Sequence, residues 1–462
     1  MDPALGGQTL TSSEAARFRA TLSVVLRSNR AYRYVRASWA IAGTLLRYGL
    51  LLGRERLPFG RPDPAAWDRA HARTGRAIYR LATALGGAFV KLGQVLGARA
   101  DFFPESLLGP LRALHDSVPP RPLEALRGHV EAELGRPLSA VFPTIEAEPL
   151  GAASLAQVHR ARLVDGTDVA VKIQYPEARK LFPGDLASLR RAVRAVRLLN
   201  RRLDLRAMVD ELAAFVTLEL DFAREARSTQ RARHELASRP DVLVPRVHEA
   251  ISTDRLLVLE FIEGAPLSDL ARVRQVAPDL RALAERVASV YCAMIFEHGF
   301  FHGDPHPGNI LACADGRIAL LDFGLAKELP AGFGAGVAAI IAGAMGGQPE
   351  RAVAAARSIG FSIREGDPAG FVALIRALLG QYAADKGLLD LLQTGIVASV
   401  PSHFALIVRA LILLNGLSHR LVPGQRIIAM SVAAQVARLV QAAGSGGGPP
   451  SAVALSPGQE AP

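Results

Sequence analysis

The sequence predicts an α+β protein with two lobes, a small lobe built around a sheet and a larger helical lobe. Two observations support this prediction. Residues 154–164 and 168–175 contain alternating apolar and polar positions on either side of Asp165-Gly166, a dipeptide typical of hairpin turns. From about residue 267 to 440, helical patterns dominate and only short apolar runs interrupt them. A cleft between two such lobes is a common position for a ligand.

Changes in composition divide the 462 residues into five segments. The last segment is rich in Gly, Pro and Ser, which is typical of a disordered tail. In order, we expect a basic helical leader (residues 1–60), a helical extension (61–140), the smaller lobe (141–262), the larger helical lobe (263–440) and the tail (441–462).

The leader contains an apolar run, ASWAIAGTLLRYGLLLG, at residues 37–53. Arg47 interrupts this run, and it is shorter than the ~20 apolar residues that a membrane-spanning helix needs. Three arginines precede it, and a basic flank followed by Trp39 and a Leu-rich body suits a helix that lies in a membrane interface. A helix packed into the protein core would explain the same pattern, so both interpretations stay open.

Charge and cysteine content restrict the partners and the compartment. The net charge of +11 and the isoelectric point of about 10.2 are compatible with an anionic membrane surface or with phosphate-bearing ligands. The arginines are scattered, and a GC-rich genome would also produce such an arginine-rich composition. We expect no nucleic acid partner. Cys292 and Cys313 are too few for a disulfide framework, and the N-terminus lacks the order of a secretory signal. We therefore expect a cytoplasmic protein.

The stretch FFHGDPHPGN places Asp304 and Asn309 five residues apart, and Asp322 follows in the stretch IALLDFGLA. Phosphoryl transfer needs one carboxylate near the attacking oxygen, and a second carboxylate with an amide oxygen to hold Mg²⁺ on the phosphates. The spacing therefore indicates Asp304 as a catalytic residue, and Asn309 and Asp322 as Mg²⁺ ligands. A transition-metal site formed by His302, Asp304 and His306 is a competing interpretation of the same loop.

Lys172 lies in the second strand of the predicted hairpin, in the stretch DVAVKIQY. A lysine on such a strand can reach the α- and β-phosphates of ATP, and it needs a glutamate on a following helix as its partner. Glu225 is the candidate because it follows Asp221 by four residues and shares its helix face. A lysine exposed on a strand would be the simpler interpretation, but the order of these motifs along the chain favours the catalytic one.

A loop rich in alanine precedes the lysine strand where a kinase carries a glycine-rich loop. Within GAASLAQVH, we expect Ala152, Ala153 and Ser154 to contact ATP, together with Glu260 and Ile262 at the end of the apolar strand near residue 260. Methyl groups restrict the close approach of backbone to phosphate. We therefore expect ATP binding, but no ordinary protein phosphorylation.

These motifs together resemble those of the UbiB/AarF family of atypical kinases, which includes the mitochondrial ADCK proteins. The resemblance covers about residues 80 to 330 and rests on five stretches. They are KLGQ from Lys91 to Gln94, GAASLAQVH, Glu219-Leu-Asp221 followed by Glu225, HGDPHPGN, and DFG at Asp322.

The resemblance implies a protein-kinase-like fold with a helical N-terminal extension packed over the cleft. Lys91 and Gln94 would form a regulatory lid in the place of a protein substrate, held by Glu219 and Asp221. The resemblance further implies an ATPase or kinase that uses ATP and Mg²⁺ and supports isoprenoid-quinone biosynthesis or lipid homeostasis. Its implied partners are an anionic membrane surface, to whose inner face the protein would bind peripherally, and lipids or enzymes of the quinone pathway.

Gly151 and Gly303 stand where the family usually has alanine, and Ser228 where many members have asparagine. We expect Gly151 to alter nucleotide preference or autophosphorylation, and Gly303 to have little effect. Two other functions remain as alternatives. A small-molecule phosphotransferase would share the loop around Asp304 but lacks the Lys-x-Gly-Gln motif, and a non-catalytic scaffold would bind ATP as a switch.

Overall fold

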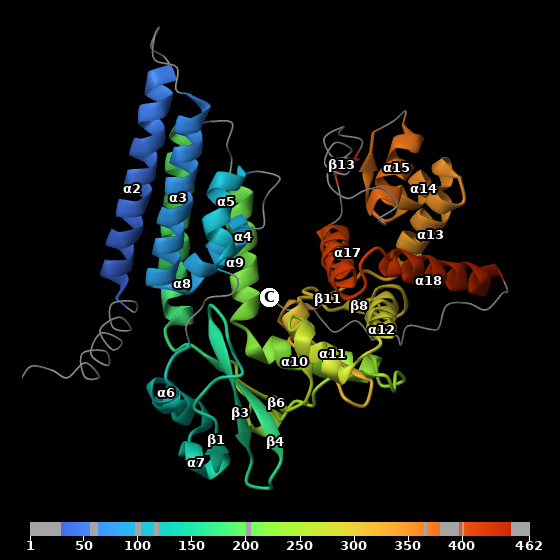
Figure 1. Cartoon of the computed structure of the whole chain (residues 1–462), viewed down its shortest axis with the longest axis horizontal. Coiled ribbons are helices and arrows are strands. Elements are labelled where there is room, and N and C mark those ends of the chain that lie inside the picture. Colours follow the sequence, from blue (N-terminus) through green and yellow to red (C-terminus); the bar gives the residue numbers. More distant parts are fainter. Residues whose placement is uncertain are drawn as a thin grey trace, which may run out of the picture. The chain divides into compact units, whose positions relative to one another are not determined.

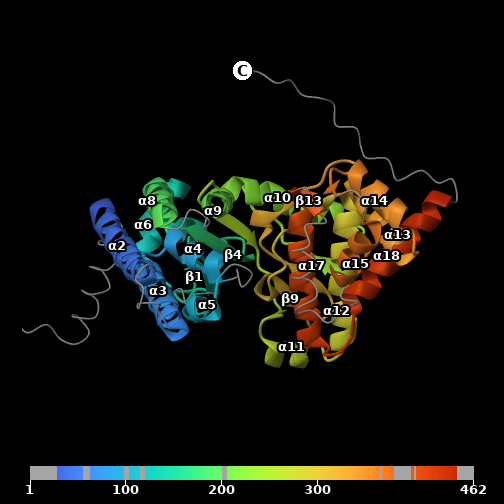
Figure 2. The same ribbon diagram turned by 90° about the horizontal axis from the view of Figure 1, so that it is seen from above.

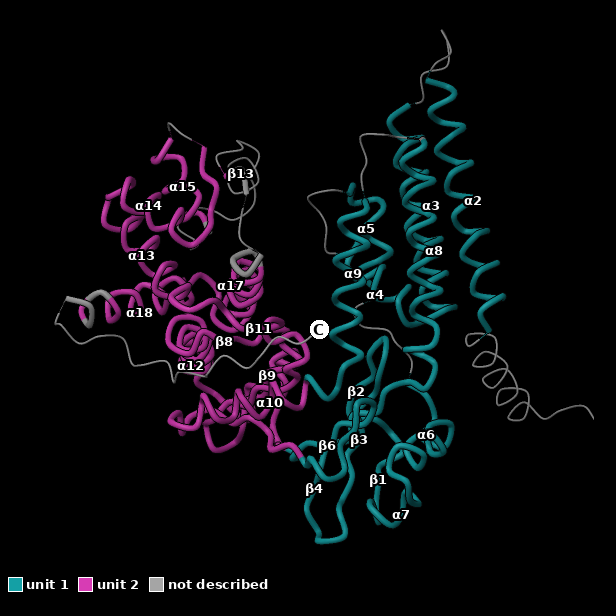
Figure 3. Tube along the Cα trace, turned by 180° about the vertical axis from the view of Figure 1, so that it is seen from behind, with its two compact units in different colours: residues 1–224, 248–261 teal, residues 225–247, 262–462 magenta. Residues whose placement is uncertain are grey.

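The chain divides into two compact units, which Figure 3 shows in different colours. Unit 1 comprises Met1–Arg224 and His248–Phe261, and unit 2 comprises Glu225–Val247 and Ile262–Pro462. The structure, a computed structural model, describes residues 29–55, 63–97, 103–114, 120–199, 205–364, 367–378, 397–399 and 402–444. The first part of the predicted leader and the predicted tail after residue 444 lie outside the described residues.

The N-terminal part of unit 1 is helical. The helix α2 lies beside α3 and α8, and α4 lies beside α3, α5 and α9 (Figures 1 and 2). Buried leucines and phenylalanines such as Phe89, Leu111 and Leu212 form the core that these helices share. The bounds are α2 (Arg30–Glu55), α3 (Pro64–Leu85), α4 (Ala88–Gly97), α5 (Glu105–Arg112), α8 (Ala178–Leu199) and α9 (Arg206–Glu219).

The remainder of unit 1 is an antiparallel sheet with two further helices. The predicted hairpin is present: β3 pairs with β4 from Ala156 opposite Gln174 to Arg162 opposite Asp168. The strand order is β1-β3-β4-β6, and β2 pairs with β3. The strands are β1 (Thr144–Ile145), β2 (Gly151–Ala152), β3 (Ala156–Arg162), β4 (Asp168–Gln174) and β6 (Leu256–Glu260); the helices are α6 (Glu124–Leu134), α7 (Leu138–Val141) and the 3₁₀ turn η1 (Glu249–Ile251).

Alternation along β4 separates a core face from a functional face. Val169, Val171 and Ile173 are fully buried and pack with residues of α6 and α7. Lys172 points to the opposite face because successive side chains of a strand alternate. The predicted half-buried strand therefore presents its lysine away from the core.

Unit 2 is mainly helical. The helix α10 (Phe222–Glu235) begins in unit 1 and continues into unit 2. Two of the short apolar runs, near residues 310 and 320, form the strands β9 and β10, in a four-stranded sheet of order β5-β10-β9-β7. Two further pairs, β8 with β11 and β12 with β13, form two-stranded sheets. The strands of unit 2 are β5 (Val242–Leu243), β7 (Ala265–Pro266), β8 (Phe300–Phe301), β9 (Ile310–Ala312), β10 (Ile318–Leu320), β11 (Lys327–Glu328), β12 (Ser362–Ile363) and β13 (Val397–Ser399).

The helices of unit 2 pack into one apolar core, which includes Tyr291, Phe323 and Leu414. The apolar segment from residue 331 to 347 contains α13, which is largely buried. The helices are α11 (Leu270–Val276), α12 (Leu280–Ala293), α13 (Phe333–Met345), α14 (Pro349–Ser358), α15 (Pro368–Leu378), α17 (Ser402–Leu421) and α18 (Ile427–Gly444), with the π-helix η2 (Met294–His298) and the 3₁₀ turns η3 (Pro307–Asn309) and η4 (Phe323–Leu325).

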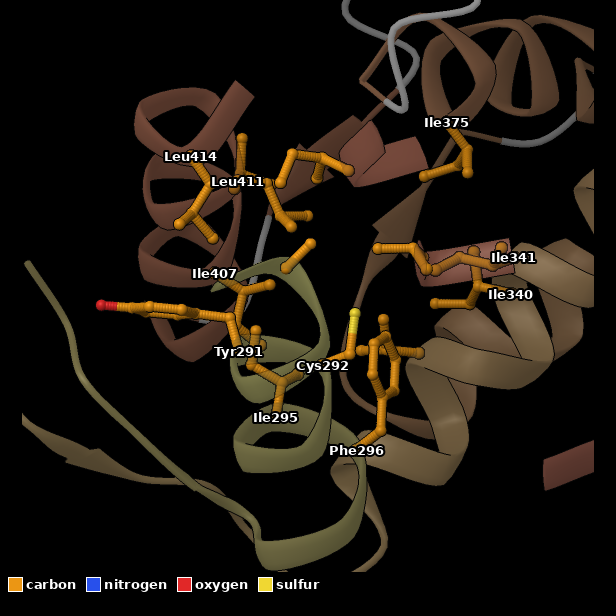
Figure 4. A pocket seen from close by; sticks show the side chains of 15 residues that line it. Tyr291, Cys292, Ile295, Phe296, Ile340, Ile341, Ile375, Ile407, Leu411 and Leu414 are labelled. Carbon is orange, nitrogen blue, oxygen red and sulfur yellow. The ribbon is translucent and has the colours of Figure 1, made fainter. Parts of the chain in front are cut away.

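A small apolar cavity lies within this core, between α12, α13, α15, α17 and α18 (Figure 4). Its volume is about 30 Å³, and its walls are side chains such as Ile295, Ile341 and Leu411. One or two water-sized molecules would fill such a volume. Because the walls are apolar, the cavity offers no ligand a polar partner. Tyr291 lines this cavity, and its hydroxyl points away from the other lining side chains in Figure 4.

Candidate active site

The loop that contains Asp304 and Asn309 connects β8 to β9, and His302 holds its shape. His302 is 1% exposed, and its Nε2 lies 2.6 Å from the carbonyl oxygen of Leu321. Its Nδ1 accepts a hydrogen bond from the backbone N–H of Asp304 at 3.3 Å, which implies that Nε2 carries the proton. The histidine therefore ties the loop to the strand that precedes Asp322. Both of its ring nitrogens are engaged with backbone.

Backbone hydrogen bonds bring the two predicted Mg²⁺ ligands to neighbouring positions. The N–H of Asn309 donates to His306 O at 2.8 Å, and Asn309 O accepts from the N–H of Leu321 at 2.8 Å. Leu321 directly precedes Asp322, so the β9–β10 hairpin sets the spacing between Asn309 and Asp322. Among the residues that the structure describes, no three or more His, Cys, Asp and Glu side chains form a metal cluster. An ion held by Asn309 and Asp322 would therefore need further ligands from phosphate oxygens or water.

Asp322 has an unusual backbone. Its φ of 56° makes it the one non-glycine residue with a positive φ in the described part of the chain. This conformation costs an L-residue about 1–2 kcal/mol, and aspartate tolerates it better than most because its side chain can bond locally. Asp322 does so, because its Oδ1 accepts from the N–H of Gly324 at 3.1 Å. Strained backbone of this kind is common at functional sites.

The carboxylate of Glu225 comes close to the same turn. Glu225 is 2% exposed. A Cβ placed on Gly324 would lie 3.3 Å from Glu225 Oε2 and 3.1 Å from Asp322 Oδ1. Two acidic side chains therefore converge on a glycine that leaves them room. The predicted partner of Glu225 is Lys172, which belongs to unit 1, and this pairing stays a prediction.

Two side chains near Asp304 were not anticipated from the sequence. Arg409 on α17 has its Nη2 3.7 Å from Asp304 Oδ1. Tyr291 on α12 is buried, and its ring meets the His302 ring edge-on with centroids 6.2 Å apart. Burial raises the pKa of Tyr291 well above its ordinary value, and the Asp304 carboxylate raises it further. Neither residue has a sequence signal, because each reaches the loop from a distant helix.

Lys172 lies on the face of the unit 1 sheet that turns away from the core. It stands opposite Val158 on β3 and Leu257 on β6. Its Nζ lies 5.2 Å from the centroid of the Phe222 ring, at the beginning of α10. A cation over an aromatic face is attracted to it. The contact holds the ammonium group above the sheet.

The alanine-rich loop is a tight, anchored turn. Ala152 pairs with Gln157 as the end of β2, and the N–H of Ala153 donates to Ala156 O at 2.8 Å. Ser154 is buried, and the N–H of Tyr175 donates to the oxygen of Leu155 at 2.9 Å. The loop therefore has less freedom than a run of glycines would have. Contacts of Ala152, Ala153 and Ser154 with ATP stay a prediction.

The predicted lid residues behave differently from one another. Lys91 on α4 forms an ion pair with Glu219 at the end of α9, as expected. Gln94 donates instead to the carbonyl oxygen of Leu114, at 3.0 Å. Asp221 accepts from the N–H of Arg224 at 2.9 Å and so caps the first turn of α10. Lys91 and Glu219 are thus brought together within unit 1, and the lid role of the four residues stays a prediction.

The remaining two predicted ATP contacts are Glu260 and Ile262, which lie where the chain crosses from unit 1 to unit 2. Glu260 ends β6, where it stands opposite Val169. Ile262 is the first residue of the second stretch of unit 2. This position at the end of the sheet is compatible with the predicted contact to ATP.

Comparison with known proteins identifies the family of this fold. A model of the ABC1 atypical kinase-like domain matches residues 113–356. The mouse protein AarF domain-containing protein kinase 1 is 35% identical over 302 residues, which are 64% of this chain and 58% of that protein. The Arabidopsis thaliana protein ACTIVITY OF BC1 COMPLEX KINASE 1, chloroplastic, is 31% identical over 395 residues, which are 82% of this chain and 56% of that protein.

A solved structure supports the fold. The Mycobacterium tuberculosis protein Rv3197, in a complex with erythromycin, matches 79% of this chain and 98% of its own with a TM-score of 0.51 and 24% identity. The fold is therefore a mixed α+β kinase-like fold with N-terminal helices. The chain spans somewhat more than half the length of the curated relatives described above. Because the domain model covers more than half of its residues, the chain belongs to the ABC1 (UbiB/AarF) family of atypical kinase-like proteins.

Proposed function

We propose that this protein is an atypical kinase or ATPase of the UbiB type that binds Mg²⁺ and ATP and supports isoprenoid-quinone biosynthesis or lipid homeostasis at a membrane. ATP binding follows from the kinase-like family. The observation that supports catalysis is the arrangement in unit 2. The β9–β10 hairpin joins Asn309 to the residue before Asp322, and Glu225 approaches the same turn.

The residues present fit an Mg²⁺ site of the kinase type. Asn309 and Asp322 offer an amide and a carboxylate oxygen, and oxygen ligands suit this hard cation. Bound there, Mg²⁺ would neutralise charge on the phosphates during transfer. Asp304 would orient the attacking hydroxyl or water. Lys172 would contact the α- and β-phosphates, with Glu225 as the residue that orients its ammonium group.

Two features favour hydrolysis or an unorthodox acceptor over protein phosphorylation. The turn formed by Ala152, Ala153 and Ser154 is anchored on both sides and lacks the freedom of a glycine-rich loop. The ion pair between Lys91 and Glu219 holds α4 against α9, in support of a fixed lid. With such a lid over the ATP site, a small molecule, a lipid or water would be a better acceptor than a protein.

The outward face of α2 supports a peripheral membrane location. Val35, Trp39, Leu46 and Leu50 are between 49% and 75% exposed on this helix. In the described part of the chain, no helix combines the length and apolar content that crossing a bilayer requires. The helix α2 has Glu55 as its one acidic residue, and the neighbouring α8 exposes four arginines, which are Arg190, Arg191, Arg194 and Arg197. An apolar helix face beside arginines complements an anionic lipid surface.

The test is Mg²⁺-dependent ATP hydrolysis by the purified full chain, beside Asp322→Asn. Removing one charged ligand should reduce turnover by about 100-fold or more while the fold survives, because electrostatic contacts of this kind contribute several kcal/mol to catalysis. Asp315→Asn is the matched control, since Asp315 is an exposed aspartate on the β9–β10 turn. Equal turnover in Asp322→Asn and the wild type would contradict the metal assignment. ATP binding without turnover in any variant would instead favour the scaffold.

A further inference from the structure

We propose that Arg33 is a positioning residue that couples the outward, membrane-facing side of α2 to α4, the helix that carries Lys91 and Gln94. This inference rests on the proposed lid and deepens it, because it names what controls the position of the lid. All the residues involved belong to unit 1.

Arg33 contacts three elements at once. It is 4% exposed although it belongs to a helix with one face open to solvent. Its Nε donates to Asp185 Oδ1 on α8 at 2.8 Å, and its Nη2 donates to the other oxygen of the same carboxylate. Its Nη1 donates to the carbonyl oxygen of Leu85, the last residue of α3, at 2.5 Å. The guanidinium carbon lies 5.6 Å from the ring centroid of Phe89, in the first turn of α4.

These contacts lie on both sides of the two-glycine joint between α3 and α4. Gly86 and Gly87 separate α3 from α4, and their φ angles are 67° and 55°. Glycine adopts such angles at little cost and does not by itself fix the direction of the next helix. The direction of α4 must therefore come from packing, and Arg33 bonds the residue before the joint while its charge faces Phe89 just after it. Lys91 follows Phe89 by two residues.

The helix α4 is thus held at three places. Arg33 holds its first turn, and the ion pair of Lys91 with Glu219 holds it against α9. Gln94 adds a hydrogen bond to Leu114 one turn further on. A displacement of α2 would move Arg33. This would change the direction of α4 and the geometry of the ion pair between Lys91 and Glu219.

Stability alone gives little reason for a buried charge pair at this position. Burial raises the pKa of the Asp185 carboxyl even though the Arg33 guanidinium lowers it, so the loss of water outweighs the attraction to the partner. Apolar residues of similar size commonly replace a buried ion pair without loss of stability. The bidentate geometry instead sets the distance and angle between α2 and α8, which is what a positioning role requires.

The exposed face of α2 is the surface on which an anionic lipid surface would act. Trp39, Leu46 and Leu50 are exposed, while Arg33, Ala37 and Leu51 are buried on the opposite side. The guanidinium of Arg191 on α8 lies 4.8 Å from the ring centroid of Tyr34 on α2, so the two helices also meet at the exposed side. An anionic lipid surface that binds the outer face would press on a helix whose inner face holds the joint before α4.

The test measures hydrogen exchange in α4 with and without vesicles that contain phosphatidylglycerol, with phosphatidylcholine vesicles as the uncharged comparison. The full chain is compared with the double variant Arg33→Met/Asp185→Leu, which removes both buried charges and leaves none unpaired. Arg33→Lys is a second variant that keeps the charge but loses the forked geometry. Arg76→Met is the control, because Arg76 is an exposed arginine on α3, outside the basic flank of α2.

We expect anionic vesicles to change the exchange rates of α4 in the wild type and in Arg76→Met by about fivefold or more, the lower end of allosteric coupling. The double variant and Arg33→Lys should float with the vesicles like the wild type, but their α4 rates should no longer respond. A vesicle response of wild-type size in both variants would overturn the proposal, as would a wild-type chain that binds vesicles without any response. A wild type that responds in α4 yet hydrolyses no ATP would contradict the proposed enzyme and leave the coupling intact.

Discussion

Single residues of the loop around Asp304 are constrained by backbone contacts that the sequence does not show. Gly303 was expected to tolerate the alanine that is usual in the family. The structure places its backbone against η4, so that a Cβ on Gly303 would lie 2.2 Å from the carbonyl oxygen of Leu325. Two non-bonded heavy atoms repel strongly at this separation, so one of the two segments must move. Gly303 therefore belongs to the geometry of the site.

This contact gives a prediction for Gly303→Ala. The added methyl group should push the loop away from η4 and lower the stability of unit 2 by about 1–3 kcal/mol. Turnover should fall as well, because Asp304 follows directly. The measurement is the urea midpoint of the unfolding transition together with the rate of ATP hydrolysis. Gly151→Ala is the control, since a Cβ there would meet no atom within 4 Å, and it should unfold at or above the wild-type midpoint. Equal midpoints for both variants would refute the contact.

At the scale of elements, the strand β3 connects the sheet to the segment before α6. Gln157 is 1% exposed, and its Oε1 accepts from the N–H of Arg121 at 2.9 Å, while its Nε2 donates to Arg121 O at 3.0 Å. The same Nε2 lies 2.7 Å from His159 Nε2, and His159 Nδ1 lies 2.7 Å from the oxygen of Glu146. Burial lowers the pKa of His159, so this histidine stays neutral and can accept from Gln157. The Gln-Val-His motif therefore anchors β3 to the backbone at Arg121 and Glu146.

Replacing Gln157 should be costly. Gln157→Leu would leave the partly buried backbone groups of Arg121 and the ring nitrogen of His159 without this partner, at up to about 1–3 kcal/mol for each group. We expect the midpoint of urea unfolding of unit 1 to fall clearly below that of Gln174→Leu. Gln174 is equally buried and donates one hydrogen bond, to the oxygen of Leu220 at 2.9 Å. If the two variants unfold at the same urea concentration, the anchor role is wrong.

The helix α2 has one buried side and one exposed side, so its structure is compatible with both interpretations of its sequence. A membrane-interface helix and a core helix were both compatible with residues 37–53. The structure buries Ala37 and Leu51 against the neighbouring helices and leaves Trp39 75% exposed. One side of the helix is thus a packing surface and the other is open. The sequence pattern could not separate the two, because apolar residues occupy both sides.

At the scale of the whole molecule, the open side of α2 predicts where the protein meets a lipid surface. Trp39→Glu/Leu46→Glu should weaken binding to phosphatidylglycerol vesicles by about tenfold or more, because each large apolar side chain contributes about 1.5–3 kcal/mol when it leaves water. Binding by the wild type should weaken with salt, since arginines provide part of the attraction. The measurement is flotation with vesicles in a density gradient.

The control for this prediction is Ile412→Glu. Ile412 is 53% exposed on α17, in unit 2, and its replacement adds one negative charge at an apolar position elsewhere, where the α2 variant adds two. It should float with vesicles like the wild type. If Ile412→Glu and the α2 variant lose binding equally, added negative charge is the cause, and the docking surface is wrong.

The fold class, the order of the motifs and the hairpin that carries Lys172 could all be read from the sequence, because each depends on a local period or spacing. Asp304, Asn309 and Asp322 are close in the chain, and the β9–β10 hairpin keeps Asn309 and Asp322 at neighbouring positions. The pair of Lys91 with Glu219 joins residues far apart in the chain, and only resemblance to a family indicated it.

The tertiary structure decided the contacts that no local pattern records. In the sequence, Arg33 is one of the three arginines of the basic flank before residue 37. In the structure it lies buried against Asp185, 152 residues later. Arg409 reaches Asp304 from α17, and Leu325 sets the need for glycine at position 303. Periodicity reports which face of an element is apolar, but which distant side chain meets that face depends on how the elements pack. The sequence by itself therefore determined the chemistry of the candidate site, and packing determined which residues hold that site in place.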